Sequence, residues 1–152
     1  MFKVLLLILL FPILSVSSFK AQAVELEPFE TDYCTMFIDG NWQHCCLEHD
    51  LRYWIGGDKA DQFASDLKLK ACVKEEAGVL WANTIYHAVR LGHYSPIKNK
   101  YKWSWGWSER EEFSKLSALE KQTVIKEIHR STLDPKVVRR FIWENNLEAA
   151  QN

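Results

Sequence analysis

Two adjacent cysteines, Cys45 and Cys46, restrict the fold of this chain more than any other feature of its sequence. Neighbours in a helix can hardly bond each other, so we expect Cys34 to bond one of them and Cys72 the other. Two disulfides would then tie one segment to both an earlier and a later part of the chain. A structural zinc site is the alternative, but the cysteines lack the paired C-x-x-C spacing that such sites usually show.

The amino terminus predicts export to an oxidising compartment, where disulfides form. Lys3 precedes an apolar run at residues 4–16, and a polar stretch then ends in Ala-Gln-Ala at residues 21–23. This is the layout of a secretory signal peptide rather than of a buried helix, and the run is shorter than the ~20 residues that span a bilayer. We expect residues 1–23 to be removed, and residues 24–152 to form one periplasmic or secreted domain.

The charge of the mature chain argues against nucleic acid as a partner. Two lysines and no acidic residue leave with the signal peptide, so 17 basic and 20 acidic side chains remain, a net charge of −3. Nucleic-acid binding would require a basic footprint on the domain. The partner must therefore be sought among other classes of molecule.

Helical patterns dominate the mature chain, and we see no strand pattern beyond a short hairpin. The first helix is expected to begin near Trp42, after a loop at residues 31–42, and to stop at Gly56-Gly57. Asp58 and Asp61 then have the spacing of a capping box at the start of a second helix. The sequence predicts a mostly α fold with further helices at about residues 58–74, 80–91, 117–130 and 134–150, the part after about residue 108 being a helical extension.

The segment YKWSWGW at residues 101–107 has two interpretations. Trp and Tyr favour the headgroup region of a membrane, which would make these rings a lipid-binding surface. Alternatively, the rings pack in the core, with Trp103, Trp105 and Trp107 on one face of an extended strand. The lysines at residues 98–102 favour contact with a phospholipid or membrane surface.

His49 and Asp50 are the strongest candidates for chemistry because of where a helix places them. His49 and Tyr53, four residues apart, share one face, and Asp50 lies on the adjoining stripe about 100° away. His49 could therefore act as a base while Asp50 serves as a hard oxygen ligand in the same cleft. Calcium takes carboxylates and backbone carbonyls, and an irregular loop such as residues 31–42 can supply the carbonyls.

A histidine base also needs an acceptor that orients it, and Asp61 and Asp66 on the second helix are the candidates. If a Cys45–Cys72 bridge joined antiparallel helices, His49 would lie ~6 Å from it along the axis. Asp66 would lie ~9 Å and Asp61 ~16 Å from the same bridge. Asp61 is better placed around the axis, but an axial mismatch is harder to bridge with a short side chain, so we expect Asp66 to orient the histidine.

The run at residues 45–53 resembles the core of secreted phospholipase A2. It matches the family motif C-C-x-x-H-D-x-x-Y position for position, and residues 32–107 are similar to a bacterial exported branch of phospholipase A2-like proteins. The resemblance implies two long antiparallel disulfide-linked helices beside a calcium-type loop, with additional carboxyl-terminal helices. It also implies the disulfide pairing Cys34–Cys46 and Cys45–Cys72.

The resemblance further implies a calcium-dependent esterase that hydrolyses a glycerophospholipid. His49 would abstract a proton from water, Asp66 would hold His49, and Tyr53 would hydrogen-bond that aspartate. An inactive scaffold that binds lipid or a partner protein is the alternative, because the loop lacks the family's usual glycine-rich form. The expected Ca²⁺ ligands are Asp50, the Tyr33 carbonyl, a carboxylate from Asp32 or Asp39, and Gly40.

Overall fold

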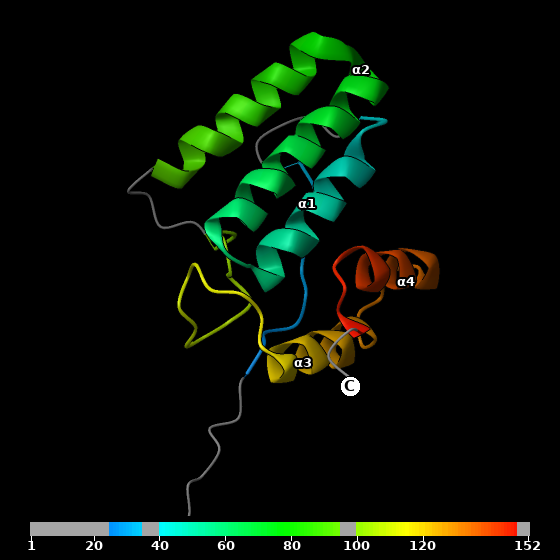
Figure 1. Ribbon diagram of the computed structural model, residues 1–152. Helices are drawn as coiled ribbons and strands as arrows, with labels where there is room; N and C mark the ends of the chain where they lie inside the picture. The colour runs from blue at the N-terminus through cyan, green and yellow to red at the C-terminus, as the bar shows by residue number, and fades with distance from the viewer. Residues whose placement is uncertain (1–24, 35–39, 95–99, 149–152) are drawn as a thin grey trace, which may run out of the picture.

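The computed structural model describes residues 25–34, 40–94 and 100–148, and over these residues the fold is mostly helical (Figure 1). The expected signal peptide at residues 1–23 and the candidate ligand Asp39 lie outside the described residues. The helices that the structure describes are α1 (Gln43–Ile55), α2 (Lys59–Tyr94), α3 (Ala118–Ile128) and α4 (Pro135–Glu144).

α1 begins and ends where the sequence predicted. Trp42 precedes its first residue, and Gly56 ends it with an N–H that donates to the Arg52 carbonyl at 2.9 Å. Gly56 has a φ of 68°, in the left-handed region that favours glycine, and a Cβ there would lie 1.8 Å from Ser104 Oγ. The chain can therefore turn sharply at this point and enter α2.

The starts of the later helices follow the predicted caps. Asp58 Oδ1 accepts from the Asp61 N–H, and Asp61 Oδ2 accepts from the Asp58 N–H, both at 3.0 Å. Ser117 and Glu120 form the same reciprocal arrangement before α3. α4 starts after Asp134, whose side chain accepts from a first-turn N–H, with a proline at the start of the helix as predicted.

α2 is divided by a bend at Gly78. The φ of 85° and ψ of 173° at Gly78 are not helical, so the helices predicted at residues 58–74 and 80–91 are the two arms of α2. Figure 1 shows the second arm returning beside the first. The Lys70 ammonium on the first arm lies 4.7 Å from the centre of the Tyr86 ring on the second, which agrees with this arrangement.

The structure contains two disulfides, Cys34–Cys46 and Cys45–Cys72, in the pairing that the resemblance implies. The first ties α1 to the preceding loop, and the second ties α1 to the first arm of α2. Because all four cysteines are bonded, the zinc site considered from the sequence is not formed. Disulfides of this kind are typical of chains that fold in an oxidising environment.

α1 lies between two hydrophobic clusters. On one side, Leu51, Trp54 and Ile55 pack with side chains of α3 and α4, so the part of the chain after residue 108 covers the back of α1. On the other side, α1 contributes cysteines to a cluster shared with both arms of α2. The buried members of this second cluster are Cys34, Cys45, Cys46, Leu69, Val73, Ala82 and Ile85.

The aromatic segment at residues 101–107 packs against the end of α1 instead of forming an extended strand. Trp103 and Trp107 are buried, and their indole N–H groups donate to the carbonyls of Gly57 at 2.9 Å and Ile55 at 2.8 Å. Carbonyls at a helix end lack partners within the helix, so this segment satisfies them. The expected lipid contact is therefore wrong for Trp103 and Trp107, whose rings are removed from the surface.

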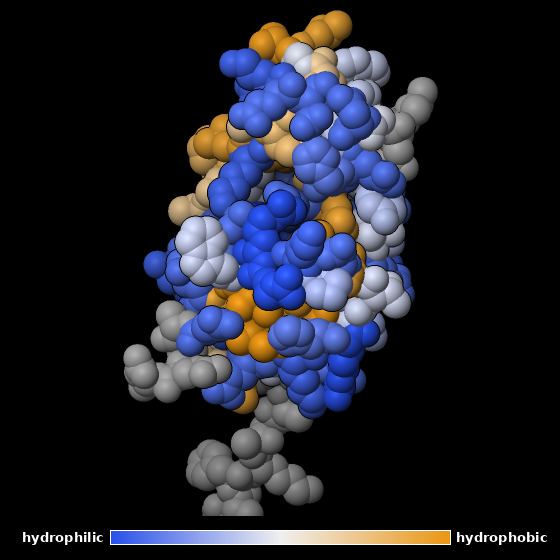
Figure 2. Space-filling model, turned by 90° about the vertical axis from the view of Figure 1, so that its right-hand side faces the viewer, coloured by the Kyte–Doolittle hydropathy of each residue, from blue (hydrophilic) through white to orange (hydrophobic). Residues whose placement is uncertain are grey.

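The molecular face in Figure 2 is mostly hydrophilic, with hydrophobic side chains at its upper end and in a patch below its middle. Figure 1 places the bend of α2 at that end. Val79 and Leu80, which follow the bend, are 57% and 77% exposed. Among the described residues, no helix is both long enough and apolar enough to cross a membrane.

Candidate active site

A cleft of about 320 Å³ lies where α1 faces the two arms of α2. His49, Asp50 and Tyr53 reach it from α1, and His93 reaches it from the second arm of α2. Such a mixture of apolar walls and a few convergent polar groups is typical of ligand-binding sites. The apolar side chains that line the cleft include Leu69, Ile85, Ala88 and Val89.

His49 and Asp66 form a direct pair at the cleft. His49 Nε2 lies 2.9 Å from Asp66 Oδ1, and both side chains are buried. Asp61, the rival candidate, is occupied with the backbone of Asp58 at the start of α2. Distance along the helix axis therefore predicted the partner of His49 correctly, whereas angular position around the axis, which favoured Asp61, did not.

Tyr53 and His93 extend this pair into a network whose donors can be assigned. Tyr53 Oη lies 2.7 Å from Asp66 Oδ1 and 2.6 Å from His93 Nε2. Because a carboxylate only accepts, the single Tyr53 proton goes to Asp66, and His93 must donate its Nε2 proton to Tyr53. Gln62 Nε2 lies 3.2 Å from His93 Nδ1 and donates to it, which agrees with this tautomer.

Asp66 is fully buried and is held ionised by its neighbours. Burial alone would raise the pKa of its carboxyl group. Hydrogen bonds from His49, His93, Tyr53 and Arg90 outweigh burial and hold this pKa well below its usual range. Arg90 Nη1 donates to Asp66 Oδ2 at 2.9 Å, and it brings the positive charge that a buried carboxylate requires.

The His49 ring is kept neutral by its surroundings. Burial lowers the pKa of His49, and this effect exceeds the opposing hydrogen bond and charge of Asp66. A neutral imidazole that donates from Nε2 to Asp66 carries its lone pair on Nδ1. The arrangement therefore presents Nδ1 as the basic nitrogen of a histidine that already has an orienting carboxylate.

This network also includes His93, Arg90 and Gln62, to which no sequence pattern assigned a role. Gln62 and Asp66 are four residues apart on the first arm, and Arg90 and His93 are three apart on the second, so each pair shares a helix face. That spacing is the signal that could have found them. Which two faces meet depends on the bend at Gly78, which no helical period reveals.

Asp50 lies next to the pair in an environment that is suited to a cation. Its side chain is buried, and Thr31 Oγ1 donates to its Oδ2 at 2.5 Å. The pKa of Asp50 is raised to about 7, chiefly by burial; the hydrogen bond from Thr31 opposes this shift, and the negative charge of Asp32 adds to it. A cation beside these oxygens would relieve both the burial and the repulsion, and carboxylate oxygens are among the ligands that calcium takes.

The structure brings together only part of the expected ligand set. Tyr33 and Asp50 both line the cleft, and Tyr33 has an unusual φ of 56°, with its N–H donating to Thr31 Oγ1 at 2.8 Å. Gly40 instead accepts from the Gln43 N–H at 3.1 Å, at the start of α1. In the described part of the chain, therefore, the candidate loop ligand that lines the cleft, Tyr33, comes before Cys34.

Comparison of the chain with protein-family models, curated proteins and solved structures finds no match. The function must therefore be inferred from the arrangement of the site. That arrangement contains a neutral histidine with an ionised partner, a buried carboxylate with oxygen neighbours, and an apolar wall.

Proposed function

We propose that the protein is an exported, calcium-dependent esterase of the phospholipase A2 type, acting on a glycerophospholipid. The observation that carries the proposal is the 2.9 Å pair of His49 and Asp66, with Asp50 adjacent to His49 in the same cleft. Together they supply a base, its orienting carboxylate and a hard oxygen ligand. In this proposal the 1–23 segment is a signal peptide, and the two disulfides suit the oxidising compartment.

The fold proposed for this function is the helical core of that family. Cys45 forms a disulfide with Cys72. His49, four residues after Cys45, forms a hydrogen bond with Asp66, which lies six residues before Cys72. Contacts that advance along one helix and retreat along the other are those of antiparallel neighbours. This pairing holds the base and its acceptor on facing surfaces, with the loop before Cys34 beside them as the proposed calcium-type loop.

In the proposed reaction, His49 Nδ1 takes a proton from a water molecule in the cleft, and the water oxygen attacks the ester carbonyl carbon. The resulting imidazolium is stabilised by Asp66, which stays ionised throughout. The proton then passes from His49 to the leaving alkoxide as the ester C–O bond breaks. The products are a fatty acid and a lysophospholipid.

The network behind Asp66 prepares the site before substrate binds. Tyr53 and Arg90 each hold one oxygen of Asp66, and His93 supports Tyr53. A carboxylate held by several donors cannot rotate away from His49, so the histidine keeps the tautomer that leaves Nδ1 basic. This preorganisation avoids a reorganisation cost during the reaction.

The lining of the cleft suits an amphipathic substrate. The apolar side chains that line the cleft, Leu69, Ile85, Ala88 and Val89, offer contact to an acyl chain. Lys102 contributes a positive charge to the lining. Asp50, the Tyr33 carbonyl and Asp32 would hold Ca²⁺. When bound there, the ion supplies positive charge for the lipid phosphate and for the oxyanion that develops on the ester.

The proposal is tested by fatty-acid release from glycerophospholipid vesicles, with calcium and with a chelator. Wild-type protein should release fatty acid only with calcium, and His49→Gln should lower the rate by about 10²–10⁴-fold, as expected for loss of a general base. The matched control is His87→Gln, a histidine exposed on the second arm of α2, which should keep full activity. Undiminished hydrolysis by His49→Gln would rule out this mechanism.

One observation favours a second candidate, a lipid-binding scaffold without hydrolysis. Thr31 already bonds Asp50 at 2.5 Å, and a pKa of about 7 allows that carboxyl group to be neutral without any cation. Vesicle co-sedimentation that requires the cleft, together with no fatty-acid release at millimolar calcium, would favour the scaffold over the esterase.

A further inference from the structure

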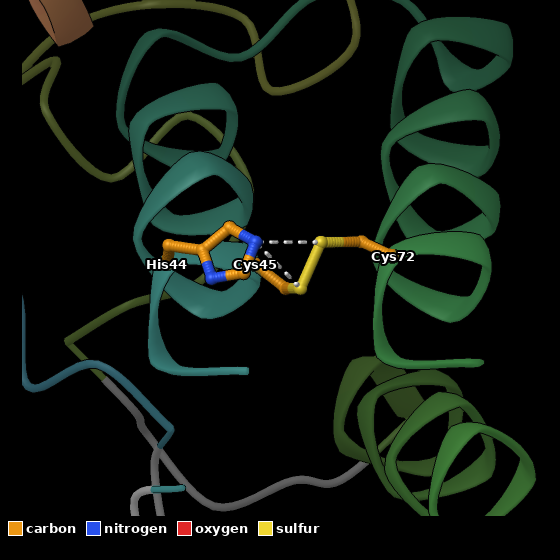
Figure 3. Close-up of side chains that lie close together, drawn as sticks. All are labelled: His44, Cys45 and Cys72. Carbon is orange, nitrogen blue, oxygen red and sulfur yellow. Dashed lines mark hydrogen bonds between the residues drawn. A yellow bond between two sulfur atoms is a disulfide. The ribbon is translucent and has the colours of Figure 1, made fainter. Parts of the chain in front are cut away.

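A histidine outside the cleft lies against one of the disulfides. Figure 3 shows the His44 ring directed at the two sulfurs of the Cys45–Cys72 bond, which joins α1 to α2. His44 Nε2 is 3.5 Å from Cys72 Sγ and 3.7 Å from Cys45 Sγ. These residues take no part in the proposed ester hydrolysis.

A fourth polar group completes the surroundings of His44. Glu76 Oε1 lies 3.8 Å from His44 Nε2. Asn41 Nδ2 donates to the Glu76 carbonyl at 2.7 Å and approaches its Oε2 at 3.4 Å, so Glu76 is held beside the histidine. One imidazole nitrogen and two sulfurs therefore lie close together between α1 and α2, and a carboxylate oxygen lies beside the imidazole.

The two nitrogen–sulfur distances are close to those between ligands of tetrahedral zinc, whereas the two sulfurs are bonded to each other. With Zn–S of about 2.3 Å and Zn–N of about 2.0 Å, the tetrahedral angle separates nitrogen from sulfur by about 3.5 Å. His44 Nε2 already has nearly this distance to both Sγ atoms. Sulfurs in a disulfide are not thiolates and do not bind zinc in this way, so the bond between them must first be opened.

We propose that His44, Cys45, Cys72 and Glu76 form a zinc site when the Cys45–Cys72 disulfide is reduced. A dithiol reductant opens the bond: Cys45 and Cys72 each gain one electron and one proton, and the dithiol closes to its own disulfide. Zinc then replaces the two thiol protons, which pass to solvent, and His44 Nε2 and Glu76 Oε1 take the other two positions. The site is accessible, since the His44 and Glu76 side chains are 49% and 38% exposed.

The consequence is a metal crosslink in place of a covalent one. Cys45 is four residues before His49, and Cys72 is six residues after Asp66, so either crosslink holds the same two helices together near the catalytic pair. Zinc would therefore keep α1 on α2 before the disulfide forms, or after it is reduced. The proposal does not depend on esterase activity, because it concerns groups outside the cleft.

The test is cobalt binding to reduced protein, followed by displacement with zinc. In the Cys34→Ala/Cys46→Ala variant, Cys45 and Cys72 are the only cysteines. After reduction with a water-soluble phosphine and removal of oxygen, cobalt should produce visible absorption of tetrahedral geometry together with a thiolate charge-transfer band. Zinc should displace cobalt and abolish both. The oxidised protein should show neither band.

Matched substitutions in that variant distinguish cobalt binding by all four proposed residues from binding by the two cysteine thiols alone. His44→Ala and Glu76→Gln should each weaken cobalt binding by more than roughly tenfold, whereas the exposed His87→Ala should leave it unchanged. If circular dichroism shows the double variant to be unfolded, wild-type protein is used, and zinc should protect Cys45 and Cys72 from alkylation after reduction. Absence of tetrahedral absorption or of protection in folded reduced protein, or indifference to His44→Ala, would overturn the proposal.

Discussion

The two faces of α1 are built in opposite ways. Leu51 and Trp54, on the back, are fully buried among apolar side chains of α3 and α4. His49 and Tyr53, on the front, are buried among polar groups that must be paired with one another. The back face stabilises the fold by removing apolar surface from water, whereas the front face is costly to bury and depends on complete hydrogen bonding.

A substitution is therefore expected to have different effects on the two faces. Loss of an apolar side chain on the back leaves a cavity and lowers the free energy of unfolding, while the front can keep its geometry. Loss of one polar group on the front leaves its buried partners unsatisfied and disturbs the chemistry directly. Both disulfides lie on the front, where they add covalent support to the more costly face.

The largest effect is expected for Asp66→Asn. The amide carries no charge for Arg90 and cannot accept every hydrogen bond that reaches Asp66, so the tautomer of His49 is no longer fixed. Ester hydrolysis should fall by about 10²–10⁴-fold, measured by fatty-acid release from vesicles. Asp61→Asn is the control and should affect stability only, by a few tenths to about 1 kcal/mol. A greater loss of turnover in folded Asp61→Asn would reverse the assignment of the two aspartates.

On the back face, Trp54→Ala should destabilise the protein by about 3–5 kcal/mol, as expected for a buried tryptophan. Trp54 is fully buried, and its indole N–H donates to the Glu27 carbonyl at 2.8 Å. Urea unfolding measures the loss, and activity at low temperature should remain within a few-fold of wild type. Trp143→Ala is the control, since that ring is 77% exposed and should change stability little. A loss of turnover in still-folded Trp54→Ala would show that the two faces are coupled.

Acid should distinguish the faces as well. The pKa of Asp66 is lower in the folded protein than in the unfolded chain, so the unfolded chain binds more protons at low pH. The stability that Asp66 contributes is complete above the unfolded carboxyl pKa of about 3.9 and is lost as the pH falls through its lower folded value. Urea unfolding from pH 7 down to pH 3 should show a steeper loss for wild type than for Asp66→Asn. Parallel curves would contradict this linkage.

The smallest effect concerns the bend that joins the two arms of α2. Gly78→Ala should cost about 1–2 kcal/mol, because the φ of 85° disfavours any Cβ although no atom lies within 4 Å of one. Gly92→Ala is the matched control: it also meets nothing within 4 Å but lies in regular helix, so it should stabilise by roughly 0.5–1 kcal/mol. Thermal unfolding compares the two. Equal changes in melting temperature for the two variants would show that a side chain at residue 78 does not strain the backbone of the bend.

Much of the local structure could be predicted because its causes lie within a few residues. Gly56 ends α1, and the capping box of Asp58 and Asp61 starts α2, through interactions between residues that are close in sequence. The pairing of His49 with Asp66 could also be predicted, once a Cys45–Cys72 bridge was assumed, because a rise per residue converts sequence spacing into distance. The expectation of lipid contact failed for Trp103 and Trp107, because tryptophan is found both at membrane surfaces and in protein cores, and the segment alone does not distinguish the two.

Sequence alone specifies which residues share a helix face, where the helices start, and which chemical groups are present. The contacts of Arg90 and His93 with Asp66, 24 and 27 residues away, follow from the tertiary fold, because the bend at Gly78 sets which faces of the two arms meet. It likewise decided that Trp103 and Trp107 cover the end of α1. Local patterns follow from backbone geometry within one turn, whereas contacts between distant segments depend on how the whole chain excludes water from its core.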